Sequence, residues 1–487
     1  MLGNGFTSYS LIQIPVFLRI ASVTLIALIA CKFIPAKKTS NNYLQFIVPT
    51  LAVLFFAVHL CTHLICTPSG GVHVGVYGNV VWNTANGDFY MSDWFTNILG
   101  YHMLIISPFI YLPAIIFSNP FAFTIMHLLF VALGGIAIER LMFKISNNIR
   151  LSATAGIIYF FNPYIISWFN NSFTVYSPIF VLLPLTFFYA ESNKKNLAGL
   201  LALSTALLLE DIAIGLALFW TAELFFRKKK FLPVWFGPAV ILILSVYYFF
   251  IKPHLINVSS ESQHLIEFLK FGFIGDVSSK IKFLLHLIVG TAGLCLFSPV
   301  FLLIGLPDVI LAILSPTLEV HLVESPYLPA LASSMMIAAV YGMKKVSELL
   351  PQTLSEKIPS FMNLFVILLS VAAYTNFVFS INNITACNEY NYERPFALDF
   401  IPVGATVATN DQTFYGWAID RRCILLDKVW FSWLADVSEK KAPNCEWILL
   451  NSSKNNSGRE VLMNLISSGR FQIVSSKGDI FIARRNQ

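Results

Sequence analysis

Acidic residues among aromatic rings, in a polar stretch beside long apolar runs, are the first groups in this sequence that suit chemistry. The stretch 67–103 contains Asp88 and Asp93, with tryptophan and tyrosine rings around them. A carboxylate can accept the proton of an attacking hydroxyl, and an aromatic ring offers an apolar face to the carbons of a sugar. We therefore predict Asp88 and Asp93 as candidate catalytic bases. The competing interpretation is an interfacial aromatic belt with solvated acids.

A second candidate is an acidic pair within an apolar stretch. Glu210 and Asp211 lie in LALSTALLLEDIAIGLALFW, and Asp308 lies in the apolar segment GLPDVIL. A carboxylate at membrane depth costs at least about 2.5 kcal/mol unless it is paired or hydrated, so such residues are functional hypotheses by default. We predict that Glu210 and Asp211 bind substrate. The alternative is that they only cap the turn of a helical hairpin.

Four residues of other polar segments complete the predicted substrate-binding set. His73 and His102 border the first polar stretch, and His321 and Tyr327 lie between two later apolar runs. If both segments lie on one side of a membrane, they can meet around a single cavity. As ordinary polar loops they need no function.

Metal and nucleotide motifs are weak in this sequence. His59 and His63 are four residues apart on one helical face, which is a metal-ligand spacing, but no third ligand is evident. We predict structural histidines there and assign no metal site. The sequence contains no glycine-rich phosphate loop, no cysteine pairs at zinc spacing and no nucleophile elbow. ATP-driven pumping is therefore not expected.

The composition indicates that lipid surrounds most of the chain. Of 487 residues, 56% are hydrophobic and 12% are charged, and the mean hydropathy is +0.69. A soluble chain of this length does not need so much apolar surface. The net charge of +6 comes largely from short lysine clusters beside apolar runs. These clusters indicate topology rather than a nucleic-acid-binding face, so we expect a cell-membrane protein without a nucleic-acid partner.

The apolar runs predict an all-α polytopic membrane domain over residues 1–380, with about 12 crossings. Basic residues flank both ends of 197–226, so this stretch should double back near Glu210 on the external side. The stretch 102–117 contains two prolines and is expected to be a re-entrant or interfacial helix. The remaining spans are predicted at 11–34, 45–66, 120–138, 152–168, 176–190, 231–251, 281–315 (two crossings), 328–342 and 359–380.

The composition changes after residue 380. ATVAT, CILL, EWILL, FQIV and DIFIA are short β-rich runs, and GREVLMNLISSG predicts a helix that begins near Ser457 and ends at Gly469. We predict a small extracytoplasmic α/β domain over 381–487. Two of its three cysteines can pair in an oxidising compartment, and the sequence leaves the choice open among Cys387, Cys423 and Cys445.

Five segments stand out by their order and spacing. They are GVYGNVVWNTANGDF, LGYHMLIISPFIYLPA, LLEDIAIGL, GLPDVILAILS followed by SPYLPAL, and IPVGATVATNDQTFYGWAIDRRCILL. Together they resemble an uncharacterised family of prokaryotic multi-pass membrane proteins that is grouped with the GT-C glycosyltransferases. The resemblance extends from about Gly71 to the C-terminus.

The resemblance implies a GT-C-like fold with an outward-facing cavity. It also implies a donor sugar linked to polyprenyl or dolichyl phosphate, with an acidic residue of the first external loop as base or metal ligand. His102 matches the family's loop histidine, and Tyr327 matches its late-loop aromatic residue. Glu210 and Asp211 match its acidic pair. A divalent cation would be compatible with such a site without being required.

The sequence departs from the family pattern at three points. His73 stands where an aspartate is expected, Leu209 where a lysine is usual, and an Asn-Ser-Phe sequence at 171–173 replaces a Phe-Asp-Phe-His pattern. The resemblance implies a membrane glycosyltransferase-like protein that takes sugar from a lipid phosphate carrier. The alternatives are a transporter or lipid-handling protein, and a non-catalytic scaffold whose C-terminal domain binds a partner.

Overall fold

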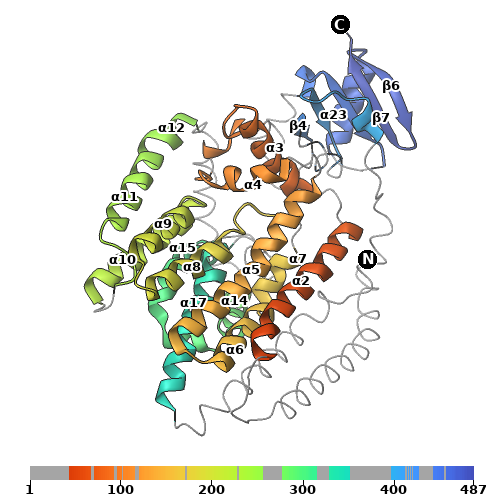
Figure 1. The fold of residues 1–487 in the computed structure, drawn as a ribbon. Coiled ribbons are helices and arrows are strands. Elements are labelled where there is room, and N and C mark those ends of the chain that lie inside the picture. Colours follow the sequence, from red (N-terminus) through yellow and green to blue (C-terminus); the bar gives the residue numbers. More distant parts are fainter. Residues whose placement is uncertain are drawn as a thin grey trace.

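The computed structural model consists of a helical part and a C-terminal domain (Figure 1). The predicted spans 11–34 and 359–380 lie outside the described residues, as does the boundary predicted near residue 380. The structure describes residues 43–66, 71–92, 96–100, 102–115, 120–170, 173–226, 230–255, 277–314, 328–350, 396–411, 414, 416, 418, 420–426, 442–453 and 457–486.

Three helical stretches of this part of the chain are long and apolar enough to cross a bilayer, namely Leu44–His63, Phe121–Ser146 and Phe236–Leu255. Several others are apolar but shorter, so the number of crossings stays a prediction. The helical part comprises α2 (Leu44–Cys66), α3 (Gly71–Ala85), α4 (Ser107–Ile115), α5 (Phe121–Ser146), α6 (Ile149–Phe160), α7 (Pro163–Asn170), α8 (Ile179–Glu191), α9 (Lys195–Ala206), α10 (Glu210–Phe226), α11 (Phe236–Val246), η3 (Tyr247–Ile251), α12 (Lys252–Leu255), α14 (Val277–Gly290), η4 (Leu294–Phe297), η5 (Pro299–Gly305), α15 (Leu306–Leu314) and α17 (Pro329–Leu349).

The stretch 197–226 doubles back, as the sequence predicts. Trp235, which follows α10, donates from Nε1 to Asn196 Oδ1 at the start of α9 over 3.3 Å. The Trp235 ring also packs so closely on Gly199 that a Cβ atom there would collide with it. A single helix of 30 residues would instead separate its ends by about 45 Å. The turn between α9 and α10 therefore brings Glu210 and Asp211 to the first turn of α10.

The span predicted at 152–168 is wrong as a single helix, because α6 and α7 are separate helices there. Pro163 begins α7, where its missing N–H is not needed. Asn162 Oδ1 accepts from the backbone N–H of Tyr164 over 2.9 Å, and its Nδ2 donates to Gly290 O over 2.9 Å. Asn162 thus caps the new helix and ties the break to α14.

The predicted external loop 67–103 contains a helix that the sequence analysis missed. α3 is followed by a short hairpin in which β1 (Met91–Ser92) pairs antiparallel with β2 (Thr96–Asn97). The glycines and valines of α3 have low helix propensity, so the sequence gives little sign of it. α4 has nine residues and is about 14 Å long, which is too short to cross a bilayer.

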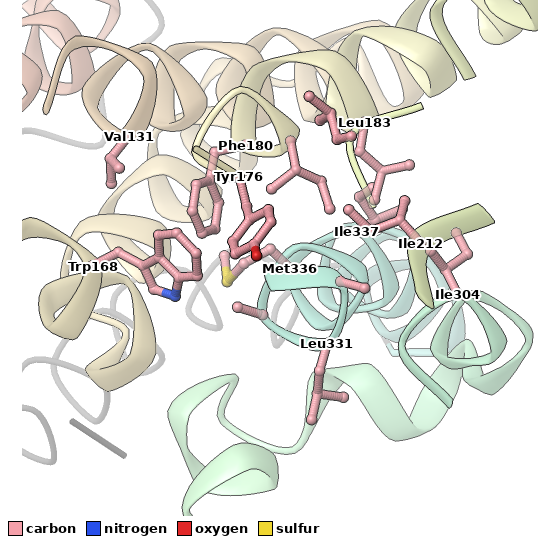
Figure 2. Close-up of a cluster of buried hydrophobic side chains, with 14 of the residues drawn as sticks. Val131, Trp168, Tyr176, Phe180, Leu183, Ile212, Ile304, Leu331, Met336 and Ile337 are labelled. Atoms are coloured by element: carbon pink, nitrogen blue, oxygen red, sulfur yellow. The ribbon is translucent and has the colours of Figure 1, made fainter. Parts of the chain in front are cut away.

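Close packing fixes α10 in the helical part. A Cβ atom at Gly215 would collide with the carbonyl oxygen of Ile304 in η5, so the two backbones touch directly. Figure 2 shows the neighbouring core, where Tyr176 lies near Phe180 and Met336. Because protein cores are close-packed, the start of α10 is held in place relative to η5, α8 and α17.

The C-terminal domain contains a five-stranded sheet in the order β4-β3-β5-β7-β6. β3 pairs parallel with β4 and β5, whereas β7 pairs antiparallel with β5 and β6. The predicted β-rich runs and the helix near Ser457 are thus confirmed. Gly469 has a φ of 74° after the helix, a conformation that favours glycine. The elements are β3 (Thr406–Thr409), β4 (Arg422–Leu425), β5 (Trp447–Asn451), α23 (Ser457–Ser467), β6 (Phe471–Lys477) and β7 (Ile480–Arg485).

The described cysteines of this domain do not form a disulfide with each other. Cys423 and Cys445 belong to different apolar clusters, which lie on opposite faces of the sheet because neighbouring strand residues alternate between them. Cys387 lies outside the described residues. The pairings that stay open are therefore those of Cys387 with Cys423 or with Cys445.

Candidate active site at the start of α10

The Glu210 carboxylate holds the segment that precedes α4. This segment belongs to the predicted external loop 67–103, called the first loop from here on. Its Oε2 accepts from the backbone N–H of Met103 over 2.8 Å, and its Oε1 lies 3.3 Å from His102 Nδ1. The Glu210 side chain is 10% exposed and that of His102 is 43% exposed. Glu210 also lies in the first turn of α10, where the helix dipole favours a negative charge. One carboxylate thus joins two segments about a hundred residues apart in sequence.

The surroundings of His102 favour its positively charged form. Burial opposes the imidazolium, but the hydrogen bond and charge of Glu210, together with the charge of Asp211, raise the pKa of His102 above its ordinary value. With Nδ1 directed at a carboxylate, protonation turns Nε2 into a second N–H donor. The site therefore offers a cationic donor whose ring is partly exposed.

Lys252 brings a second cation to the same place. It begins α12, after the π-helical turn η3, and its charge acts on both His102 and Asp211. Its Nζ lies 5.6 Å from the centre of the Tyr248 ring. π-helical turns inside α-helices are frequent at functional sites. Lys252 was not among the residues predicted for the site, although a lysine directly after an apolar run is visible in the sequence.

Asp308 lies deeper, behind Asp211. It is fully buried, and its Oδ2 accepts from the backbone N–H of Leu331 over 2.8 Å. Its Oδ1 has no hydrogen-bond partner among the described residues. Asp211 and Asp308 are close enough for their charges to interact. The start of α10 is therefore a place where three carboxylates and two cationic side chains converge.

Two tyrosines lie close enough to Glu210 for its charge to act on them. The hydroxyls of Tyr77 in α3 and Tyr176 lie 3.3 Å apart, and their rings meet edge to face with centroids 6.3 Å apart. Burial and the charge of Glu210 raise the pKa of Tyr77, so its hydroxyl stays protonated and can donate. The Tyr176 ring is buried in the core of the helical part, and Tyr77 packs against the same core. The sequence predicted the acidic pair of this site but did not single out Tyr77 or Tyr176.

The other predicted site residues are placed less centrally or lie outside the described part. Asp88 is exposed in the turn after α3, where its backbone N–H donates to Asn83 O over 2.9 Å. The contacts of Glu210 and His102 within the described residues do not include Asp88. His73 lies in the first turn of α3. Asp93, His321 and Tyr327 lie outside the described residues.

The histidine pair of α2 has structural partners. His63 Nε2 lies 2.9 Å from Phe169 O, and His59 Nδ1 lies 2.8 Å from Phe55 O. Phe169 is near the end of α7, where backbone carbonyls lack partners within the helix. Over the described ranges, no three histidine, cysteine or acidic side chains gather closely enough to hold a metal ion.

The fold is similar to that of a solved membrane protein structure. It superposes on ArnT from Cupriavidus metallidurans, in a crystal structure bound to undecaprenyl phosphate, with a TM-score of 0.53 and 10% identity over 90% of this chain and 97% of that one. The apo oligosaccharyltransferase of Archaeoglobus fulgidus gives a TM-score of 0.44 with 10% identity over 92% and 75%. At such identity the first likeness shows a shared fold, which is the GT-C fold.

The sequence shows to which protein family the chain belongs. Residues 69–481 match the family described as "Predicted membrane protein (DUF2079)", so the chain belongs to that family. It is therefore a membrane protein. No curated protein matches the sequence.

Proposed function

We propose that this chain is a membrane glycosyltransferase that takes sugar from a polyprenyl-phosphate carrier on the extracytoplasmic face, with its C-terminal domain on the same side. The observation that carries the proposal is the contact of Glu210 with His102 and Met103. It joins the first loop to the start of α10, beside Lys252. The GT-C fold is consistent with the proposal but does not by itself assign an activity.

The charges at the site suit a phosphate leaving group. The partly exposed His102 imidazolium and the Lys252 ammonium would bind the phosphate of the carrier. Glu210 orients His102 and is occupied by its own hydrogen bonds. Asp211 is then the carboxylate next to the cations that is available for a proton.

The reaction follows from these positions. The acceptor hydroxyl attacks the anomeric carbon of the sugar while the bond from that carbon to the phosphate oxygen breaks. The phosphate leaves with the bonding electrons, and His102 and Lys252 stabilise its negative charge. A carboxylate accepts the hydroxyl proton. Asp211 is our first candidate for this base, and Asp88 and Asp93 remain candidates from the first loop.

Binding of the carrier provides the first test. The full-length protein in nanodiscs should bind undecaprenyl phosphate and should not bind undecaprenol, which has the same chain without the phosphate. Equal binding of the two lipids would contradict a phosphate site and favour a general lipid-handling protein.

Transfer is tested in the host. Loss of the gene should remove one surface glycan, and the wild-type gene should restore it. Asp211→Asn should fail to restore the glycan, whereas Glu348→Gln, which changes an exposed acid in α17, should restore it. Restoration by the single variants Asp211→Asn, Asp88→Asn and Asp93→Asn alike would argue for a non-catalytic role.

A further inference from the structure

A helix of the first loop forms part of the core of the C-terminal domain. Val76 of α3 is 4% exposed and belongs to the same apolar cluster as Ile401, Val407 and Leu449. Figure 1 shows α3 on the side of the helical part that faces the sheet. Elements that share a close-packed core move together, so the position of α3 is tied to the C-terminal domain.

A chain of three hydrogen bonds continues this contact into the first loop. Asn79 Nδ2 donates to Arg421 O in the C-terminal domain over 3.0 Å. Asn83 Nδ2 donates to Asn79 Oδ1 over 3.1 Å and to Met91 O in the hairpin over 3.0 Å. Asn79 and Asn83 are 5% and 4% exposed. A buried amide that loses its partner is costly, so these bonds are strongly favoured.

Arg421 anchors the far end of the chain of hydrogen bonds. Its guanidinium donates to Leu398 O over 2.9 Å and to Ile401 O over 2.8 Å, and it pairs with Asp420. The side chain is almost fully buried. The carbonyl that accepts from Asn79 therefore belongs to a rigid part of the C-terminal domain.

We propose that Asn79 is a positioning residue through which the C-terminal domain orders the β1–β2 hairpin and the turn that carries Asp88. The same docking holds Tyr77, which lies between Val76 and Asn79 in sequence, against Tyr176. The C-terminal domain thus acts as a clamp on the first loop. This inference concerns the geometry of the loop and stands whether or not the chain transfers sugar.

Asn79→Asp isolates the link between the two parts. The aspartate keeps an acceptor for Asn83 but cannot donate to Arg421 O. In hydrogen–deuterium exchange of the full-length protein, the hairpin amides of Met91 and Ile98, which donate to Asp88 O and Tyr90 O, should exchange roughly tenfold faster. The control Asn86→Ala, which changes an exposed side chain bound to Trp82 O, should leave them unchanged.

A variant on the far side separates coupling from local damage. Arg421→Lys changes only the C-terminal domain and loses the forked hydrogen bonds to Leu398 and Ile401. It should also speed exchange at Met91 and Ile98, while α17 amides stay protected because the helical part remains folded. Wild-type exchange in the hairpin for both Asn79→Asp and Arg421→Lys would overturn the inference. Faster exchange with Asn79→Asp alone would also overturn it, because it would indicate damage within α3.

Discussion

Two regions of the helical part contain histidines with nearby polar partners, and they use them differently. At the start of α10, His102 is partly exposed and contacts a carboxylate from a distant segment. In α2, His63 is 5% exposed and contacts a backbone carbonyl. The metal-like spacing of the α2 pair is therefore a packing solution, whereas the unremarkable spacing of His102 and Glu210 produces a charged site. The partners of a histidine, rather than its spacing, distinguish chemistry from structure.

The largest expected effect is that of replacing Glu210, at the start of α10. Glu210→Ala removes the acceptor of the Met103 N–H and the partner of His102, so we expect transfer to fall by about 100-fold or more. The free energy of unfolding should fall by roughly 1–3 kcal/mol because a buried donor loses its partner. Labelled-sugar transfer in membranes and thermal unfolding measure the two effects. An active Glu210→Ala protein would remove the distinction between the regions.

A smaller effect is expected at Lys252. Lys252→Gln should weaken binding of undecaprenyl phosphate by about tenfold, and the binding that remains should depend less on salt. The control Lys344→Gln changes a lysine of α17 that pairs with Glu348 over 3.8 Å and should bind like the wild type. Equal affinity of Lys252→Gln and wild type would place the phosphate elsewhere.

At the start of α10, both stability and ligand binding should depend on pH through His102. The folded state raises the pKa of His102 above its ordinary value of 6.5, so the stabilisation by Glu210 is fully present below about pH 6.5. It is lost as pH rises through the higher folded-state pKa. Binding of undecaprenyl phosphate should weaken several-fold over that rise, measured by titration in nanodiscs. His102→Gln should flatten the profile, and an unchanged profile in this variant would assign the titration to another group.

The smallest expected effect on function lies in α2. His63→Ala leaves the Phe169 carbonyl without this partner, so it should lower the free energy of unfolding by about 1–3 kcal/mol while the folded protein keeps wild-type binding of undecaprenyl phosphate. His63→Gln places an N–H donor near the same position and should restore most of the stability. Loss of binding by folded His63→Gln would show that the α2 histidines serve the site as well.

Local sequence patterns predicted many of the helices and strands. Lysine-rich borders around 197–226 predicted the hairpin because charged residues avoid crossing the bilayer. β-branched runs and a terminal glycine predicted the C-terminal strands and α23. The break at Pro163 and the helix α3 were missed, since proline occurs in membrane helices and the composition of α3 is poor in helix formers.

The amino-acid sequence was enough to predict a membrane protein, an acidic pair at a helical turn and a small α/β domain at the C-terminal end. These are local properties of hydropathy, charge and strand propensity. The contact of Glu210 with His102, the nearby charge of Lys252, and the hydrogen bond from Asn79 to Arg421, 342 positions away, became visible only in the folded chain. Such contacts depend on how distant segments pack, and the pattern within any one segment does not contain that information.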